Sequence, residues 1–120
     1  ANMVKEFDEF IEKRLKILKK MKFNLKKVWF DPGIGFGKTL NQNLQLMRSL
    51  SKYSHKNLQI LLGSSRKSWI NFIDPSNADQ RIGGSLASIT HALQQNVNTF
   101  RIHDVQETNQ MIKVLKALNK

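Results

Sequence analysis

A glycine-rich segment, Asp31-Pro-Gly-Ile-Gly-Phe-Gly-Lys-Thr39, constrains this chain more than any other stretch, because it directly follows the apolar run Val28-Trp-Phe30. Its three glycines permit positive φ angles and close approach of a ligand to the backbone. Pro32 stiffens the turn that leaves the apolar run. An acid at one end and a lysine at the other favour a functional loop at a strand end over a glycine-rich connector without chemistry.

Two phosphate-binding motifs are excluded in their strict form by spacing. A Walker A loop needs a glycine five positions before the glycine of its Gly-Lys-Thr, and that position is Pro32 here. Gly33, Gly35 and Gly37 give G-x-G-x-G, whereas dinucleotide-binding folds use G-x-G-x-x-G. Neither motif is present, so the loop needs another interpretation.

Length and composition limit the fold class. With 120 residues, 40% of them hydrophobic, the chain can form one modest domain but falls far short of the roughly 250 residues of a complete (β/α)8 barrel. It has no cysteine, which excludes disulfides and thiolate metal sites. No apolar run approaches the ~20 residues that span a bilayer, and charged residues interrupt the start of the chain. We therefore expect a soluble cytoplasmic protein without a membrane partner.

The net charge of +11 raises nucleic acid as an alternative partner. Residues 1–27 carry nine of the twenty basic residues against four acids, and the remaining excess is diffuse. Only Lys19, Lys20 and Lys22 cluster closely, and no aromatic residue interleaves with them, as a platform for single strands requires. We interpret the charge as a solvated helix face and expect no nucleic-acid partner.

Helical and strand patterns alternate along the whole chain. A period near 3.6 predicts helices, and β-branched or aromatic runs predict strands. The predicted helices cover residues 3–21, about 41–51, 67–73, 81–95 and the stretch after Asp104, where Asp104 and Glu107 match a capping box. The predicted strands cover residues 27–30, 58–62 and 99–103, with a polar connector at 53–57. This order predicts an α/β fold of right-handed βαβ units with three parallel strands.

Polar side chains follow all three predicted strands. Asp31 ends the first strand, Gly63-Ser-Ser-Arg-Lys-Ser68 follows the second, and Arg101 and His103 end the third. Because ligands of parallel sheets gather beyond the carboxyl ends of the strands, these residues predict one site. Two paired N–H donors of a fused heterocycle suit the Asp31 carboxylate, with a carboxylate that caps loop amides as the alternative.

The other strand ends indicate an anion. Lys67 at a helix start favours an anionic or acceptor-rich ligand, with a solvent-exposed lysine as the alternative. Arg101 and His103 lie two residues apart on a strand, so both face one side and can share an anion; the alternative for His103 is a buried core residue. His55 and His91 lack partners at metal-ligand spacing and are predicted to be inert.

Four ordered blocks resemble the carboxyl-terminal part of dihydropteroate synthase, over essentially the whole chain. They are Asp31-Pro-Gly-Ile-Gly-Phe-Gly-Lys38, Gly63-Ser-Ser-Arg-Lys-Ser68, Arg81-Ile-Gly-Gly-Ser-Leu-Ala87 and Arg101-Ile-His-Asp-Val105. The resemblance implies one segment, residues 1–120, from the carboxyl-terminal portion of a (β/α)8 TIM barrel. It also implies a sulfonamide-sensitive transferase of folate biosynthesis, which joins p-aminobenzoate to 6-hydroxymethyl-7,8-dihydropterin diphosphate and releases pyrophosphate.

The resemblance also implies the roles of individual residues. Asp31 and Lys67 are similar to pterin contacts, Ser65 and Phe36 to p-aminobenzoate contacts, and Arg101 and His103 to the diphosphate site. Gly35, in the same loop as Phe36, is placed among the substrate-binding residues. No residue is assigned as a general acid or base.

The family's amino-terminal half has no counterpart in this sequence. The resemblance places the ligand of the Mg²⁺ cofactor there, so no metal ligand is expected in this segment. It also implies a homodimer and a missing half-barrel as partners. An isolated chain is then expected to be inactive, and a non-catalytic module that binds pterin or phosphate is the alternative.

Overall fold

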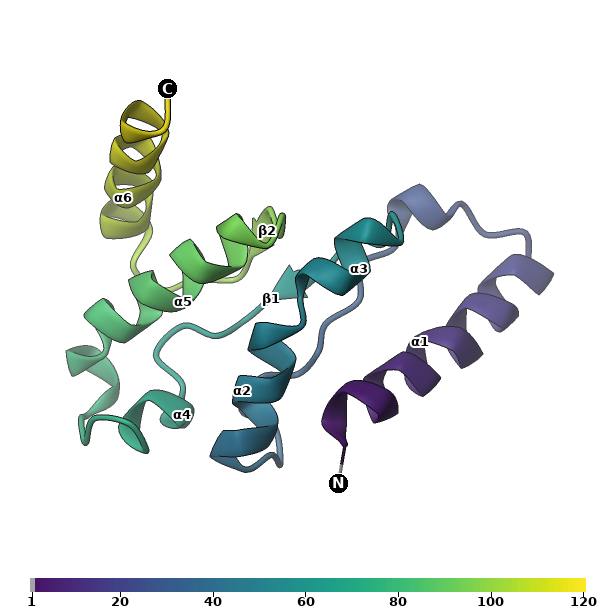
Figure 1. Cartoon of the computed structure of the whole chain (residues 1–120), viewed down its shortest axis with the longest axis horizontal. Coiled ribbons are helices and arrows are strands. Elements are labelled where there is room, and N and C mark those ends of the chain that lie inside the picture. Colours follow the sequence, from purple (N-terminus) through teal and green to yellow (C-terminus); the bar gives the residue numbers. More distant parts are fainter. Residues whose placement is uncertain (1) are drawn as a thin grey trace.

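A computed structural model describes residues 2–120 and shows helices around a small parallel sheet (Figure 1). The elements in chain order are α1 (Met3–Lys20), η1 (Leu25–Lys27), α2 (Leu40–Arg48), α3 (Ser51–His55), β1 (Leu61–Leu62), α4 (Ser68–Asn71), η2 (Ala78–Gln80), α5 (Ile82–Gln94), β2 (Thr99–Phe100) and α6 (Val105–Leu118). The predicted alternation of helices and strands is confirmed.

Side-chain caps explain where the first helices begin. The Asn2 side chain accepts a hydrogen bond from the Lys5 amide at the start of α1. Thr39, the last residue of the glycine-rich segment, forms a capping box with Gln42 at the start of α2. The loop therefore ends abruptly in a helix.

The sheet has two short strands, so the prediction of three strands was wrong. The predicted strands 58–62 and 99–103 were too long, and Arg101 and His103 follow β2 rather than lying on it. β1 and β2 are parallel, with Leu61 opposite Thr99, whereas Phe30 makes only an isolated parallel bridge to Ile60. The cause is the side chain of Gln59, whose amide donates to the carbonyls of Lys26 and Val28 at 2.7 and 3.0 Å. Those carbonyls are thus bonded to a side chain rather than to the neighbouring strand.

Two further local predictions were wrong. Residues 53–55, predicted to be connector, belong to helix α3. Asp104 is the N-cap of α6 but makes no side-chain cap bond; its carboxylate binds Arg66 instead, so the capping box with Glu107 does not form. An ion pair with a guanidinium is the stronger partner for this carboxylate.

The hydrophobic core lies between the sheet and the helices α1 to α5. Gly84 lets α5 approach α4 closely, since a Cβ there would lie 2.7 Å from the Ile70 side chain. A Cβ at Gly83 would meet nothing within 4 Å, so the close packing of α5 on α4 requires a glycine only at position 84. The buried hydrophobic residues are Phe7, Ile11, Phe30, Ile34, Leu46, Met47, Leu50, Tyr53, Ile60, Leu62, Trp69, Ile70, Ile89, Ala92 and Val97.

The molecule is flat and open, with α6 projecting beside α5 (Figure 1). Its extents are 44 × 36 × 20 Å, and its radius of gyration of 15.2 Å exceeds the ~13.6 Å of a compact domain of this length. Its accessible surface of 8011 Å² exceeds by about 1,300 Å² the area of a compact protein of this mass. That excess is large enough for a stable protein interface.

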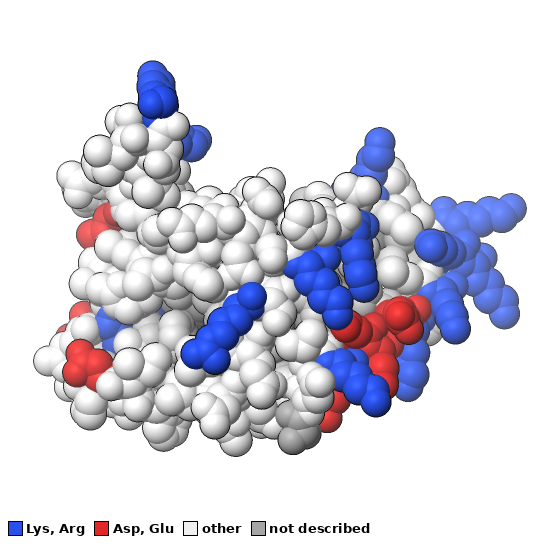
Figure 2. Space-filling model, viewed as in Figure 1, with Lys and Arg blue, Asp and Glu red and all other residues white. Residues whose placement is uncertain are grey.

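Charge is less evenly spread than the sequence indicated. Lys and Arg side chains crowd the end of the molecule where α1 ends, whereas the face over α5 carries few (Figure 2). None of the helices in residues 2–120 is both long and apolar enough to cross a membrane.

Candidate functional site

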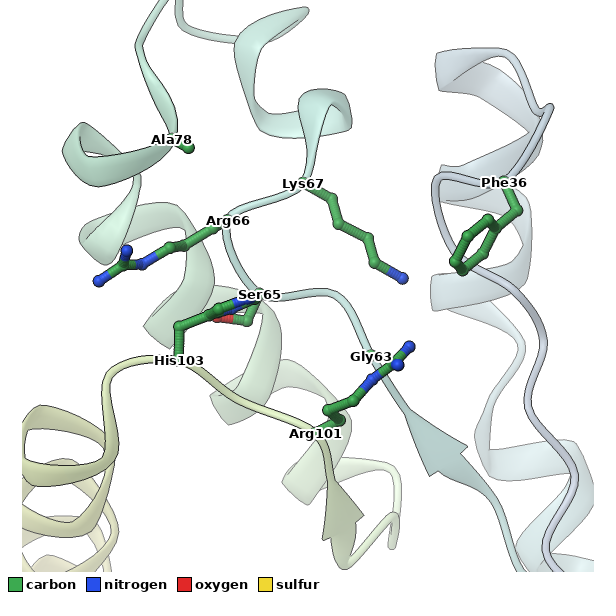
Figure 3. A pocket seen from close by; sticks show the side chains of 8 residues that line it. All are labelled: Phe36, Gly63, Ser65, Arg66, Lys67, Ala78, Arg101 and His103. Carbon is green, nitrogen blue, oxygen red and sulfur yellow. The ribbon is translucent and has the colours of Figure 1, made fainter.

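The carboxyl ends of β1 and β2 border an open pocket of about 490 Å³ (Figure 3). Its position follows from the parallel pairing, because both strands deliver their following loops to the same edge of the sheet. The lining residues are Phe36, Gly63, Ser65, Arg66, Lys67, Ala78, Arg101 and His103. Five of the seven predicted substrate-binding residues are therefore brought together: Phe36, Ser65, Lys67, Arg101 and His103.

Lys67 joins two of the strand-end loops. Its Nζ donates to the carbonyl of Ile34 at 2.7 Å and lies 4.4 Å from the centroid of the Phe36 ring. Figure 3 shows the side chain extending across the pocket toward Phe36. Burial lowers the pKa of Lys67, and the positive charges of Arg101 and Lys38 lower it further, against the opposing effect of Asp31. The alternative of a freely solvated lysine is therefore wrong.

Arg101 and Lys67 converge over a glycine. The Arg101 amide donates to the Leu62 carbonyl at 2.9 Å, which fixes the backbone just after β2. A Cβ on Gly63 would lie 3.1 Å from Nη2 of Arg101 and 3.5 Å from Nζ of Lys67. The missing side chain at position 63 thus leaves room for two cations to face one ligand.

His103 lies on the other side of the pocket. Its Nδ1 is 3.1 Å from Oγ of Ser65, which is 3% exposed. This contact joins the loop after β1 to the segment after β2 and turns both side chains toward the pocket (Figure 3). The interpretation of His103 as a buried core residue is wrong, because it lines the pocket.

Asp31 and Gly35 lie at the neighbouring glycine loop and do not line this pocket. One Asp31 oxygen accepts the Gly33 amide at 2.8 Å, so the alternative, a carboxylate that caps a loop amide, is confirmed for Oδ1. Gly35 has a φ of +88° and donates to the buried side chain of Asn43 at 2.8 Å. A Cβ at Gly35 would lie 3.1 Å from the Lys67 stem, so the glycine admits that stem.

Three residues of the site were given no individual role in the sequence analysis. Asn43 and Lys38 support the glycine loop, the latter by a 2.7 Å bond to the Gly33 carbonyl. Arg66 lines the pocket and pairs with Asp104 at 2.5 and 3.1 Å. This hydrogen-bonded pair raises the pKa of Arg66 and lowers that of Asp104. Arg66 lies within Gly63-Ser-Ser-Arg-Lys-Ser68, one of the four blocks that resemble dihydropteroate synthase. That position was the signal in the sequence that could have identified it as a site residue.

Metal ligands do not gather in the described part of the chain. Within residues 2–120, no group of three or more His, Cys, Asp or Glu side chains could hold a metal ion. The side chains present therefore do not fit the implied Mg²⁺. His91 bonds the Met47 carbonyl at 2.8 Å instead.

Comparison with known proteins decides the family. A family model described as pterin binding enzyme matches residues 1–103. The chain belongs to the pterin-binding enzyme family. The chain is 41% identical over 91 residues to dihydropteroate synthase of Escherichia coli K12, covering 76% of this chain and 32% of that protein. It is 34% identical over 116 residues to dihydropteroate synthase of Haemophilus influenzae, covering 97% of this chain and 42% of that protein.

Solved structures place the chain in the same family. It matches dihydropteroate synthase of Yersinia pestis with a TM-score of 0.91 at 31% identity, over 99% of this chain and 49% of that one. It also matches the structure of Xanthomonas albilineans dihydropteroate synthase with 4-aminobenzoic acid. The TM-score is 0.92 at 29% identity, over 99% of this chain and 44% of that one. The resemblance is thus confirmed, and the chain spans less than half the length of these relatives.

Proposed function

We propose that this chain supplies part of the active site of a dihydropteroate synthase in folate biosynthesis. The observation that carries the proposal is the convergence of Lys67, Arg101 and His103 on one pocket at the carboxyl ends of two parallel strands. Two cations and an imidazole suit a diphosphate, and the open apolar face of Phe36 suits an aromatic ring. Phe36 is 63% exposed, so its ring is accessible to a substrate.

The proposed reaction depends on charge rather than on a general base. The bond between the pterin methylene and the diphosphate oxygen breaks, and its electron pair leaves with pyrophosphate. The amine of p-aminobenzoate attacks the cationic methylene and then loses a proton. Arg101 and His103 bind the leaving diphosphate and stabilise the charge that develops on it. Positioning of the two substrates supplies the rest of the acceleration.

The pterin contacts follow from the atoms left unused in the structure's hydrogen bonds. Oδ1 of Asp31 accepts the Gly33 amide, which leaves Oδ2 as an acceptor for pterin N–H groups. The ammonium of Lys67 has three donors, and the Ile34 carbonyl uses one of them. Two donors remain for the pterin. Magnesium enters no step, because its implied ligand lies outside this chain.

We also propose that p-aminobenzoate lies beside Ser65 and Phe36 and that sulfonamides compete for this place. A Yersinia pestis relative with 31% identity has been crystallised in a sulfonamide drug complex, which supports the proposal. The implied homodimer stays a prediction. It is supported by the accessible surface area of the chain, which is larger than that expected for a compact protein of the same mass.

A chimera tests the proposed function. This chain replaces the matching part of the Haemophilus influenzae relative, with which it shares 34% identity. We expect the chimera to form dihydropteroate and pyrophosphate and the Arg101→Ala variant to lose the activity. Arg48→Ala, an exposed arginine of α2 outside the pocket, is the matched control. A folded chimera that binds pterin diphosphate without turnover would support a non-catalytic binding module instead.

A further inference from the structure

Arg66 has a backbone conformation that side chains rarely adopt. Its φ is +57°, in the left-handed region that L-residues other than glycine disfavour. The residues on either side, Ser65 and Lys67, line the pocket. The direction of both side chains therefore depends on whatever holds Arg66 in this turn.

The start of α5 bonds both peptide groups of Arg66. The Arg66 amide donates to Oγ of Ser85 at 2.9 Å, and Nη1 of Arg81 donates to the Arg66 carbonyl at 2.9 Å. Arg81 and Ser85 are themselves one helical turn apart, and the Ser85 amide donates to the Arg81 carbonyl at 2.9 Å. The two supports thus form one rigid unit.

Neither support is part of the pocket. Ser85 is 2% exposed, and the pocket lining includes neither it nor Arg81. Arg81 also donates from Nη2 to the Ser76 carbonyl at 2.6 Å, which anchors its guanidinium. Figure 3 shows the Arg66 side chain turned away from Lys67, and its guanidinium binds Asp104. Arg66 is thus held through both its backbone and its side chain.

We propose that Arg81 and Ser85 are positioning residues that hold Arg66 in the left-handed turn and thereby aim Ser65 and Lys67 into the pocket. The proposal depends on the proposed function only for the identity of the ligand. Without these supports, Arg66 relaxes toward the ordinary region, and the loop redirects the side chains beside it. The position of Lys67 over Phe36 is then lost.

Nuclear magnetic resonance of the 120-residue chain measures this position directly. Because Lys67 Nζ lies 4.4 Å from the Phe36 ring centroid, the ring current shifts the Lys67 ε-methylene signal upfield. Ser85→Ala is expected to abolish this shift and to speed exchange of the Arg66 amide about tenfold, as loss of one buried hydrogen bond predicts. Ser54→Ala is the control, because the Ser54 hydroxyl donates to the Ser51 and Gln95 carbonyls and makes no bond to the loop that holds Arg66.

Arg81→Lys provides a second variant, since Arg81 lies outside the core and its charge is kept. One ammonium cannot bond both Arg66 and Ser76 as the guanidinium does, so the upfield shift is again expected to fall. Arg66→Gly added to Ser85→Ala is expected to restore the shift, because glycine adopts positive φ without support. A lower melting temperature alone would not produce this pattern.

Titration with inorganic pyrophosphate separates the two proposals. The positioning role is overturned if the wild-type chain binds pyrophosphate and the Lys67 ε-methylene shift stays unchanged in Ser85→Ala and Arg81→Lys. If Ser85→Ala fails to fold, Arg81→Lys alone decides, and its unchanged shift overturns the role. Altered shifts in the variants of a chain that binds no pyrophosphate support the positioning role and count against the proposed function.

Discussion

Separate replacement of Lys67 and Arg101 tests the two roles that we propose for these residues, a pterin contact and an anion contact. Lys67 reaches across from the loop after β1 and keeps two donors for a pterin, whereas Arg101 lies over Gly63 where an anion fits. We expect Lys67→Ala to weaken binding of a bare pterin and, because the Lys67 charge also faces the anion, to weaken binding of the diphosphate form at least as much. Arg101→Ala should weaken the diphosphate form much more than the bare pterin.

The magnitude follows from the hydrogen bonds concerned. A bond to a charged group contributes ~1.5–3 kcal/mol, so loss of the Lys67 contact should raise Kd about 10- to 150-fold. Lys67→Ala also removes the bond to Ile34 and the contact with the Phe36 ring. Since the ammonium is only partly buried, we expect the free energy of unfolding to fall by ~1–2 kcal/mol. A solvated lysine would change it by no more than ~0.5 kcal/mol.

Calorimetric titration of the chimera with both ligands makes the comparison, and urea unfolding measures stability. Arg48→Ala controls for loss of a surface arginine. Equal losses for the two ligands in Arg101→Ala would refute the anion role of Arg101. Unchanged pterin affinity in Lys67→Ala would refute the pterin contact, even if the variant were less stable.

Four further predictions concern the chain itself. The purified 120-residue chain should form no dihydropteroate, because it lacks more than half the length of its relatives; turnover by a preparation of confirmed mass would contradict this. Its open surface should drive association with another copy or an added half-barrel, which a monodisperse monomer with exchange-protected strand amides would contradict. Burial raises the pKa of Asp8, but its hydrogen bond to Lys52 lowers it, and the pKa is below 3.8 overall. The stability that Asp8 contributes should therefore be fully present above pH 3.8 and be lost as the pH falls through the lower pKa of the folded state. Acid titration of Asp8→Asn should not show this loss of stability. Gly84→Ala should cost ~1–3 kcal/mol in thermal unfolding because of Ile70, whereas Gly83→Ala should not destabilise.

Helices were predictable because their patterns are local. The apolar period and Asn2 cap place α1 within a residue of the prediction, and α5 and α6 also follow their patterns. The first strand was not predictable, because residue 27 belongs to η1 and the side chain of Gln59, about thirty residues away in sequence, bonds the Val28 carbonyl that a ladder would use. No periodicity in residues 27–30 reveals that competitor.

The pocket was predictable from topology, and its supports were not. Parallel strands bring their carboxyl ends to one edge, so Lys67, Arg101 and His103 had to meet. Arg66 pairs with Asp104, which lies 38 positions away in sequence. The sequence pattern around Asp104 is local and therefore predicted a helix cap instead of this pair. The left-handed turn at Arg66 lacks the glycine that marks such turns in sequence.

Two neighbouring cations explain why this pocket should select an anion. Burial and the charge of Arg101 disfavour the protonated form of Lys67, whose pKa is lowered. A bound diphosphate reverses the electrostatic part of this cost by giving both cations a partner, so its binding should raise the pKa of Lys67. By linkage, pyrophosphate should bind most tightly below the pKa of Lys67 in the free chain and lose affinity as pH rises through it. Lys67→Met, which keeps the stem but has no titrating group, should show weaker binding without that pH dependence. A wild-type affinity that stays constant from neutral pH to the ordinary lysine pKa of 10.5 would show that Lys67 is not coupled to the anion.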